Sequence, residues 1–360
     1  MNSAFGSALR QLSGPVLLTG HTGFKGTWLT LLLEHLEIPV IGYALPAEKD
    51  SLFDRAKRIG SIPETFSDIR DLDSLRRFIQ LHHPATVIHL AAQPLVLESY
   101  KTPVETFATN VLGTANVLSV SFEAKTIQTI AVITTDKVYR NDNSGRAFIE
   151  SDPLAGKDPY SASKVGTEAA ISAWQQIAKV SGGPSVVSLR AGNVVGGGDW
   201  AQDRLIPDLI RGFMNGGKIT LRNPQSTRPW QHVLDPLIGY LMAVEYSLKG
   251  NQVTAFNFGP STKSLQVQRV AEIAQGAWPA PTEIETSLPS MTSVAEAVAL
   301  DLDSQKAHSE LSWTPVWSQE AAVVSTVKWW DQVLSKDVDP QLACVEDIEF
   351  ALKYSSLGNP

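Results

Sequence analysis

The stretch Gly20-His21-Thr22-Gly23-Phe24-Lys25-Gly26 lies between a short apolar run, residues 15–19, and a helical pattern from Trp28 to Leu36. Glycines at a strand-to-helix turn permit a tight bend and let a pyrophosphate approach the backbone. The helix N-terminus then offers the pyrophosphate free N–H groups and a partial positive charge. The glycine spacing alone also fits a structural turn, but its position between a strand and the first helix favours a dinucleotide-binding site.

Strands and helices alternate outward from this turn. The apolar runs that predict strands lack polar alternation, as expected for strands covered by helices on both faces; they are residues 15–19, 39–43, 85–90, 129–133 and 185–189. Helical patterns separate these runs, as at residues 71–81, and Asp158 followed by Pro159 predicts an N-cap and a first helical residue. This alternation predicts an α/β fold with a doubly wound parallel sheet of the Rossmann type.

The second half of the chain has a different texture, with more Gly, Pro, Asn and Trp and with shorter elements. We therefore predict a dinucleotide-binding domain over residues 1–193. Residues 194–360 are expected to form mainly a smaller C-terminal substrate-binding lid over the strand ends, with some segments returning to the first domain. The pattern does not place the tail after about Ser335.

Composition excludes several classes of protein. The 360-residue chain has a formal net charge of −7, which argues against nucleic acid or an anionic membrane as the main partner. Cys344 is the only cysteine, so neither a disulfide framework nor a cysteine-based metal site is expected. No His, Asp or Glu cluster has metal-ligand spacing. Residues 1–14 lack an apolar signal core and no run approaches ~18 apolar residues, which predicts a soluble, cytoplasmic protein.

Tyr160 and Lys164 are four residues apart, so they share one face of the predicted helix. The lysine charge stabilises a tyrosinate, so we expect the pKa of Tyr160 to fall from ~10 toward working pH and Tyr160 to act as a base for an alcohol proton. A surface tyrosine beside a solvated lysine would give the same spacing. Thr135, at the end of a predicted central strand, supports the catalytic interpretation because its hydroxyl can share the alcohol proton.

The residues do not choose between NAD and NADP. The acidic residue expected near the end of the second strand is missing, since residues 42–46 read Gly-Tyr-Ala-Leu-Pro, and no arginine stands there for a 2′-phosphate. Asp68 and Ile69, after the third strand, could place a carboxylate at the adenine edge. The alternative for Asp68 is a surface helix cap.

Taken together, these motifs resemble the extended short-chain dehydrogenase/reductase family. The resemblance lies in the glycine-rich start, Leu90-Ala91-Ala92-Gln93, Asn110, the Thr135-Asp136 pair and Tyr160-x-x-x-Lys164. Narrower segments resemble the CDP-glucose 4,6-dehydratases of that family; they are residues 19–26, 91–96, 190–200 and 228–233. The resemblance runs from about residue 15 to 333.

The resemblance implies NAD as cofactor, CDP-glucose as substrate and a reaction without net redox change. NAD would contact the glycine-rich turn, Asp68, Ile69, Tyr160, Lys164, Leu90, Ala91, Ala92, Gln93 and Thr109. Tyr160 would take the proton of the sugar 4-hydroxyl as hydride leaves carbon 4. Loss of the carbon-5 proton and of the 6-hydroxyl, then hydride return to carbon 6, would give CDP-4-keto-6-deoxyglucose.

Asp136 and Lys137 carry the implied elimination. Asp136 is placed to protonate the departing hydroxyl, which requires burial to raise its pKa; a plain strand-end cap is the alternative. Lys137 stands where dTDP-glucose dehydratases carry glutamate as the presumed carbon-5 base, and CDP-sugar enzymes also carry lysine there. It could act as a neutral base, or stay charged and stabilise the enolate while water or Tyr160 takes the proton.

The remaining implied contacts concern the nucleotide and the partners. Candidate substrate-binding residues are Gln93, Asn193, Arg204, Arg222 and Arg228, with the arginines near Trp200 and Trp230. A 4-epimerase, a dTDP-glucose dehydratase and a non-catalytic NAD sensor are the alternatives, and Asp136 favours dehydration over epimerisation. A homodimer is implied through two helices, one beginning near Lys101 and one carrying Tyr160. The implied pathway makes deoxysugars for a surface polysaccharide such as O-antigen.

Overall fold

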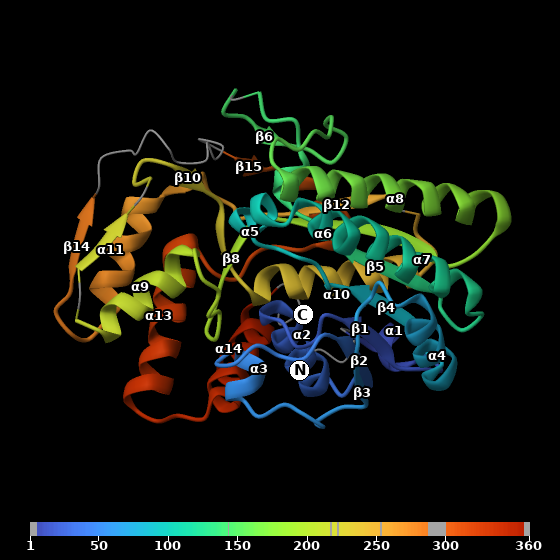
Figure 1. Cartoon of the computed structure of the whole chain (residues 1–360), viewed down its shortest axis with the longest axis horizontal. Helices are drawn as coiled ribbons and strands as arrows, with labels where there is room; N and C mark the ends of the chain where they lie inside the picture. The colour runs from blue at the N-terminus through green and yellow to red at the C-terminus, as the bar shows by residue number, and fades with distance from the viewer. Residues whose placement is uncertain are drawn as a thin grey trace.

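A seven-stranded parallel sheet forms the centre of the chain (Figure 1). The computed structural model describes residues 6–142, 144–216, 218–221, 223–252, 254–286 and 300–355. Within these ranges the strand order is β12 (Ala255–Phe258), β7 (Ser185–Ala191), β5 (Thr129–Ile133), β4 (Thr86–His89), β1 (Val16–Thr19), β2 (Val40–Ala44) and β3 (Glu64–Phe66). The fold is therefore α/β and doubly wound, as predicted.

Alternate residues of the buried strands face two different apolar cores. On β1, Val16 and Leu18 belong to a large core, whereas Leu17 faces a smaller one. On β5, Ala131 belongs to the first core and Ile130 to the second. Because both faces are covered, these strands read as unbroken apolar runs.

Helices cover both faces of the sheet. The large core joins the sheet to α2, α10, α13 and α14, and the smaller one joins it to α4, α7 and α8. The helices have these bounds: α1 Ser7–Arg10, α2 Phe24–His35, α3 Leu52–Arg55, α4 Leu72–His82, α5 Val96–Lys101, α6 Pro103–Phe107, π-helical η1 Ala108–Leu112, α7 Gly113–Glu123, 3₁₀-helical η2 Asp136–Val138, α8 Pro159–Ser181, α9 Leu205–Met214, α10 Leu234–Leu248, α11 Val267–Ala277, α12 Gln305–Leu311, α13 Gln319–Ser335 and α14 Pro340–Tyr354.

The second half of the chain contributes to two regions. Its strand β12 is the edge strand of the central sheet beside β7, and its helix α10 packs on that sheet. Helices α9 and α11 lie at one end of the molecule, away from α4 (Figure 1). Short strand pairs link the remaining segments: β8 (Asn193–Val195) with β11 (Trp230–His232), β10 (Thr227–Arg228) with β13 (Leu265–Gln266), β9 (Lys218–Leu221) with β14 (Glu283–Thr286), and β6 (Ala147–Phe148) with β15 (Asp301–Leu302).

The tail that the sequence pattern left unplaced ends in a docked helix. Asp339 caps α14 by accepting hydrogen bonds from the backbone N–H groups of Gln341 and Leu342. The helix buries Cys344 and Ile348 and packs against α2. No helix within the described ranges is long and apolar enough to cross a membrane.

The chain reverses its direction of winding between β1 and β4, which are neighbours in the sheet. In open α/β sheets, ligands bind at such a switch point, beyond the carboxyl ends of the strands. Thr19 and His89 end the two strands here, and the hydroxyl of Thr19 lies 2.6 Å from Nδ1 of His89. The glycine-rich turn follows Thr19 directly, so the fold places it at the expected ligand crevice.

Candidate active site

The glycine-rich turn between β1 and α2 fits a pyrophosphate. Gly20 has φ +76°, and a Cβ there would lie 2.7 Å from the backbone N of Ala91. A Cβ on Gly26 would lie 2.1 Å from the carbonyl O of Gly20, so both positions require glycine. At Gly23 the nearest contact of a Cβ among the described residues is Gly20 O at 3.4 Å, and no side chain caps α2 there. The helix N-terminus is thus left for an anionic ligand.

Lys25, in the first turn of α2, adds positive charge to this site. Its Nζ donates a hydrogen bond to the hydroxyl of Tyr240 at 3.3 Å. Burial, and after it the charges of Arg204 and Lys164, lower the pKa of Lys25 to about 7, against the opposing effect of Asp136. The residues of the turn and of the catalytic region therefore face one another.

An acidic residue that sequence reasoning missed lies against the glycine-rich turn. His21 is fully buried, and its Nε2 lies 2.7 Å from Oε2 of Glu64, at the start of the short edge strand β3. The ring of His21 packs against Gly42 of β2. Thr22 donates a hydrogen bond to the carbonyl of Leu45 at 2.9 Å. Glu64 was missed because its strand has only three residues.

Asp68 and Ile69 lie just beyond β3. The carboxylate of Asp68 accepts hydrogen bonds from the backbone N–H and the guanidinium of Arg70, which hold its pKa below the usual value. Asp71 caps α4 by accepting from the N–H of Ser74, so the alternative of a helix cap at Asp68 is wrong. Ile69 is buried. The adenine contact of Asp68 and Ile69 stays a prediction.

Helix α8 presents Tyr160 and Lys164 to the end of β5. Asp158 caps the helix in a reciprocal box with Ser161, and Pro159 is the first helical residue, as predicted. Tyr160 hydrogen-bonds with Thr135, and Nζ of Lys164 donates to the carbonyl O of Ile133 at 3.1 Å. Sequence positions about 25 apart thus meet at one strand end.

The expected fall in the pKa of Tyr160 is wrong for the protein chain by itself. Burial raises the pKa of Tyr160 to about 12, and the hydrogen bond between Tyr160 and Thr135 offsets only part of that rise. Lys164 is itself buried, which lowers its pKa to about 8, with Glu168 acting in the opposite direction. Desolvation outweighs the attraction that the four-residue spacing suggested.

Asp136 has one oxygen engaged and one unpartnered. The residue is 1% exposed, and its Oδ1 accepts a hydrogen bond from Oγ1 of Thr135 at 2.9 Å. Its Oδ2 is buried and has no hydrogen-bond partner among the described residues. The cap of the η2 turn is Thr135, which accepts from the N–H of Lys137, so the strand-end cap proposed as an alternative for Asp136 is not observed. An orphaned buried oxygen fits a ligand hydroxyl.

Lys137 connects Asp136 to Asn193 of β8 (Asn193–Val195). Its Nζ lies 3.7 Å from Oδ1 of Asp136 and donates to Oδ1 of Asn193 at 3.2 Å. Asn193 begins β8, whose partner strand β11 places Trp230 opposite it. The structure therefore brings Lys137 and Asn193 together.

The candidate arginines have different surroundings. Arg204 precedes α9 and pairs with Asp199 at 3.0 Å, which raises the pKa of Arg204; Tyr160 adds to that rise and is therefore close by. Arg228 is buried in β10 and donates to the carbonyl of Thr227 at 2.7 Å. Arg222 lies outside the described residues.

Trp200 does not stack on an open ligand site. Its ring centroid lies 4.8 Å from that of Trp330, and the guanidinium groups of Arg55 and Arg211 lie over the ring at 5.1 and 5.0 Å. The proposed cluster of arginines with Trp200 therefore includes Arg211 and Arg55, which the sequence did not suggest. The ring of Trp200 therefore packs against the guanidinium groups of Arg55 and Arg211.

Gln93, in the segment after β4, makes hydrogen bonds to Leu95 and to Thr106 of α6. Its amide donates to the carbonyl of Leu95 and to Oγ1 of Thr106, and its Oε1 accepts from the N–H of Leu95. Asn110 binds the backbone of Gln93 on both sides. The predicted cofactor contacts Leu90, Ala91 and Ala92 belong to this segment, and Thr109 lies in η1 beside Asn110.

The sequence of residues 16–259 matches the NAD dependent epimerase/dehydratase family. The chain belongs to this family. It is 39% identical over 323 residues, covering 87% of the chain and 89% of the relative, to the CDP-glucose 4,6-dehydratase of Salmonella typhimurium. It is 28% identical over 340 residues to the dTDP-glucose 4,6-dehydratase of Haemophilus influenzae, covering 88% of the chain and 97% of the relative.

Solved structures of epimerases and dehydratases share the fold. The UDP-glucose 4-epimerase of Thermotoga maritima, solved with UDP-glucose, matches with a TM-score of 0.76 at 21% identity, covering 89% of this chain and 99% of that one. The dTDP-glucose 4,6-dehydratase of Bacillus anthracis, solved with NAD, matches with a TM-score of 0.75 at 22% identity, covering 90% and 98%. This epimerase/dehydratase family member is an NAD-dependent nucleotide-sugar enzyme, and the glycine-rich turn fits its cofactor.

Proposed function

We propose that this enzyme is a CDP-glucose 4,6-dehydratase. The observation that carries the proposal is Oδ2 of Asp136, a buried carboxylate oxygen with no hydrogen-bond partner among the described residues, next to Thr135 and Tyr160. An acid is needed to expel the 6-hydroxyl, whereas epimerisation at carbon 4 needs none. The 39% identity to a CDP-glucose 4,6-dehydratase supports the same reaction and nucleotide.

Tyr160 acts as the base for the sugar 4-hydroxyl. Its hydroxyl is hydrogen-bonded with Thr135, which can pass the proton along. NAD, held at the glycine-rich turn and the N-terminus of α2, would supply the hydride acceptor for carbon 4 and the hydride donor for carbon 6. The positive charge of an oxidised nicotinamide would act against the burial that raises the pKa of Tyr160 in the chain alone.

Asp136 donates a proton to the departing 6-hydroxyl through its unpartnered oxygen. Thr135 fixes the other oxygen, so the acid is oriented before the substrate binds. Nζ of Lys137 donates a hydrogen bond to Oδ1 of Asn193, so we assign Lys137 to stabilising the enolate and not to taking the carbon-5 proton. Water removes the proton from carbon 5 before or as the 6-hydroxyl leaves, or Tyr160 does so after the 4-hydroxyl proton has been passed on through Thr135.

The nucleotide is held on the side of β8 and α9. Asn193 and Arg204 lie near Lys137 and Tyr160 respectively, and we assign both to the diphosphate, with Arg228 of β10 as a further contact. Gln93 and Arg222 remain candidate substrate contacts. Arginine binds phosphate in a bidentate manner, which suits a diphosphate that must be held in one orientation.

The test of the reaction type is an isotope experiment. Conversion of CDP-[4-²H]glucose is expected to yield a 4-keto-6-deoxy product with deuterium on carbon 6, because the hydride is borrowed and returned within one active site. Mass spectrometry and NMR of the product locate the label. Deuterium retained on carbon 4 of an inverted sugar would show an epimerase instead, and binding of NAD without turnover would show a sensor.

We further propose that the enzyme forms a homodimer through α5, α6 and α8. Large apolar side chains are exposed along residues 100–112, with Tyr100 46%, Val104 76%, Phe107 42% and Leu112 54% exposed. Helices α5 and α6 pack directly beside α8, so one face can present both segments to a second copy (Figure 1).

Val104→Asp is expected to convert the dimer to a monomer, because it places a charge at the centre of this apolar face. Sedimentation velocity measures the change. Leu81→Asp is the matched control, since Leu81 is 72% exposed on the separate helix α4. An unchanged dimer in Val104→Asp, or a monomeric parent enzyme, would contradict the proposed interface.

A further inference from the structure

Helix α8 carries a third buried functional group, Glu168, one turn beyond Lys164 and two turns beyond Tyr160. Glu168 is 5% exposed. Its Oε1 accepts hydrogen bonds from Oγ1 of Thr134 at 2.6 Å, Oγ of Ser188 at 2.7 Å and Nε of Arg190 at 2.8 Å. Its Oε2 accepts from Nη2 of Arg190 at 2.8 Å. The proposed reaction assigns no role to this carboxylate.

Three successive turns of α8 contact the end of β5. Tyr160 bonds with Thr135, Lys164 donates to the carbonyl of Ile133 at 3.1 Å, and Glu168 accepts from the hydroxyl of Thr134. Three successive turns of the helix therefore hold three consecutive residues of the chain. A shift at Glu168 would move Lys164 and Tyr160 against Thr135.

Glu168 also ties α8 to β7. Arg190 of β7 is fixed from its other side, because its Nη1 donates to the hydroxyl of Tyr139 and to the carbonyl of Glu150, both at 2.9 Å. Three residues further along the chain is Asn193, which accepts from Lys137. The Glu168–Arg190 pair thus links the catalytic helix to the strand that leads to the substrate side.

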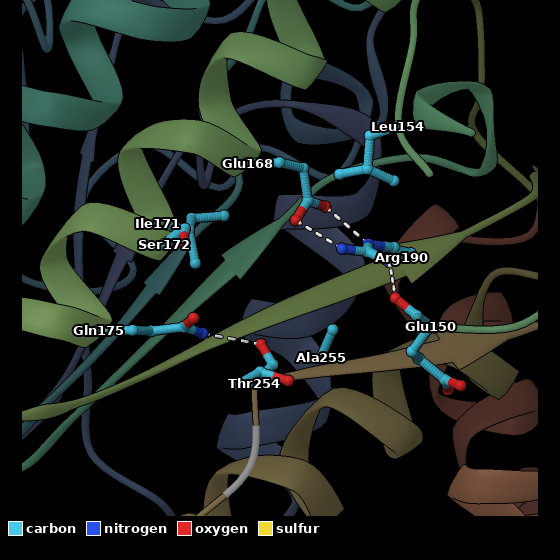
Figure 2. A pocket seen from close by; sticks show the side chains of 9 residues that line it. All are labelled: Glu150, Leu154, Glu168, Ile171, Ser172, Gln175, Arg190, Thr254 and Ala255. Carbon is cyan, nitrogen blue, oxygen red and sulfur yellow. Dashed lines mark hydrogen bonds and ion pairs between the residues drawn. The ribbon is translucent and has the colours of Figure 1, made fainter. Parts of the chain in front are cut away.

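A pocket of about 260 Å³ lies beside this pair and is lined by residues of α8 and β7 and by Glu150 and Thr254. Figure 2 shows Glu168 and Arg190 hydrogen-bonded directly to each other at this pocket, with Gln175 further along the helix bonded to Thr254. The helix is thus held on the sheet here by hydrogen bonds from Glu168 and Gln175 in addition to the apolar contact of Ile171.

We propose that Glu168 is the positioning residue of the catalytic helix: its ion pair with Arg190 fixes α8 on the end of β5 and keeps a negative charge one helical turn from Lys164. The charge keeps Lys164 protonated in a buried site, and the hydrogen bonds keep Thr135 against Tyr160. The proposal rests on the roles proposed above for Lys164 and Tyr160.

The sign of the electrostatic effect follows from the surroundings of Lys164. Burial lowers the pKa of Lys164 to about 8 and Glu168 opposes that fall. Among the described residues, Lys25 of α2 and His89 of β4 also interact with Lys164, and Tyr160 lies one turn away on α8. Burial lowers the pKa of His89 to about 3, so that it is neutral. Without the carboxylate, Lys164 loses its proton at lower pH.

The experiment compares Glu168→Gln with the parent enzyme. The pKa of Lys164 is read from the pH dependence of its labelling by acetic anhydride, followed by peptide mass spectrometry of the cofactor-free protein. We expect it to fall by about one pH unit or more. The alkaline limb of the kcat profile with CDP-glucose should move down by the same amount, with KM changed less than kcat. The labelling needs no substrate, so failure of the proposed dehydratase activity would leave this result readable.

Two further variants keep the test independent of folding. Glu168→Gln leaves Arg190 as an unpaired buried cation, so the double variant Glu168→Gln/Arg190→Gln removes both charges. Thr134→Val keeps the ion pair and removes one donor; kcat should fall about tenfold or more, and Thr134→Ser should restore it. Glu123→Gln is the matched control, with no expected effect on kcat or on the pKa of Lys164. It breaks an ion pair at the surface between Glu123 of α7 and Arg76 of α4.

A folded Glu168→Gln or double variant with the parental labelling pKa and alkaline limb overturns the electrostatic part of the proposal. Parental kcat in Thr134→Val overturns the positioning part. A lowered melting temperature with both readouts unchanged would show that the Glu168–Arg190 pair only stabilises the fold.

Discussion

Tyr160→Phe is expected to reduce turnover of CDP-glucose by at least about 10³-fold, because it removes the base that takes the 4-hydroxyl proton. Hydride cannot leave carbon 4 unless that proton also leaves. The reduction of enzyme-bound NAD on mixing with substrate, followed by absorbance at 340 nm, should disappear as well. The variant keeps the buried ring of Tyr160, which is 8% exposed in the parent enzyme, so the fold and NAD binding should be retained.

Tyr354→Phe is the control for this substitution, since Tyr354 is 56% exposed at the end of α14, far along the chain from the site. It should behave as the parent enzyme. Reduction of bound NAD at the parental rate in Tyr160→Phe would remove Tyr160 from the mechanism. The contacts that hold α8 against the end of β5 would then have no catalytic role.

Asp136→Asn is expected to separate oxidation from dehydration. Asparagine has nearly the same shape but cannot donate an acidic proton to the departing 6-hydroxyl, so formation of the 4-keto-6-deoxy product should fall about 10²- to 10⁴-fold. Oxidation at carbon 4 uses Tyr160 and should continue, so reduced cofactor should accumulate on the enzyme. Rapid-quench analysis of the sugar and absorbance at 340 nm measure the two steps.

Asp73→Asn is the control, because the side chain of Asp73 is 77% exposed on α4. Parental dehydration in Asp136→Asn would contradict the proposed acid. Loss of cofactor reduction together with dehydration would place Asp136 in the first step, beside Tyr160.

The sheet was largely predictable because its strands are buried on both faces and therefore stand out as apolar runs. The five predicted runs agree with β1, β2, β4, β5 and β7 to within two residues. The sequence pattern did not predict the bounds of β3 and β12. Strand β3 (Glu64–Phe66) is a short edge strand, and β12 (Ala255–Phe258) comes from the second half of the chain. Short strands whose neighbours are distant in sequence leave little periodicity to detect.

The candidate site was predictable where residue types were constrained by local geometry. Gly20 and Gly26 are required by backbone approaches under 3 Å, and the cap at Asp158 fixed the start of the helix that carries Tyr160. The pKa of Tyr160 was not predictable, because helical spacing says nothing about desolvation. Glu168 was missed for a related reason, because its partners are distant in sequence. Thr134 directly follows β5, and Ser188 and Arg190 lie in β7.

The central claim is that the site dehydrates CDP-glucose, and the labelled conversion described above tests it most directly when it is repeated with four nucleotides. CDP-, dTDP-, UDP- and GDP-glucose, each deuterated at carbon 4, are offered separately to the purified enzyme, and kcat/KM for the 4-keto-6-deoxy product is measured. We predict a preference for CDP-glucose of at least about tenfold, with the label on carbon 6. Preferred turnover of dTDP-glucose would contradict the nucleotide assignment, and a product that keeps its 6-hydroxyl would contradict dehydration itself.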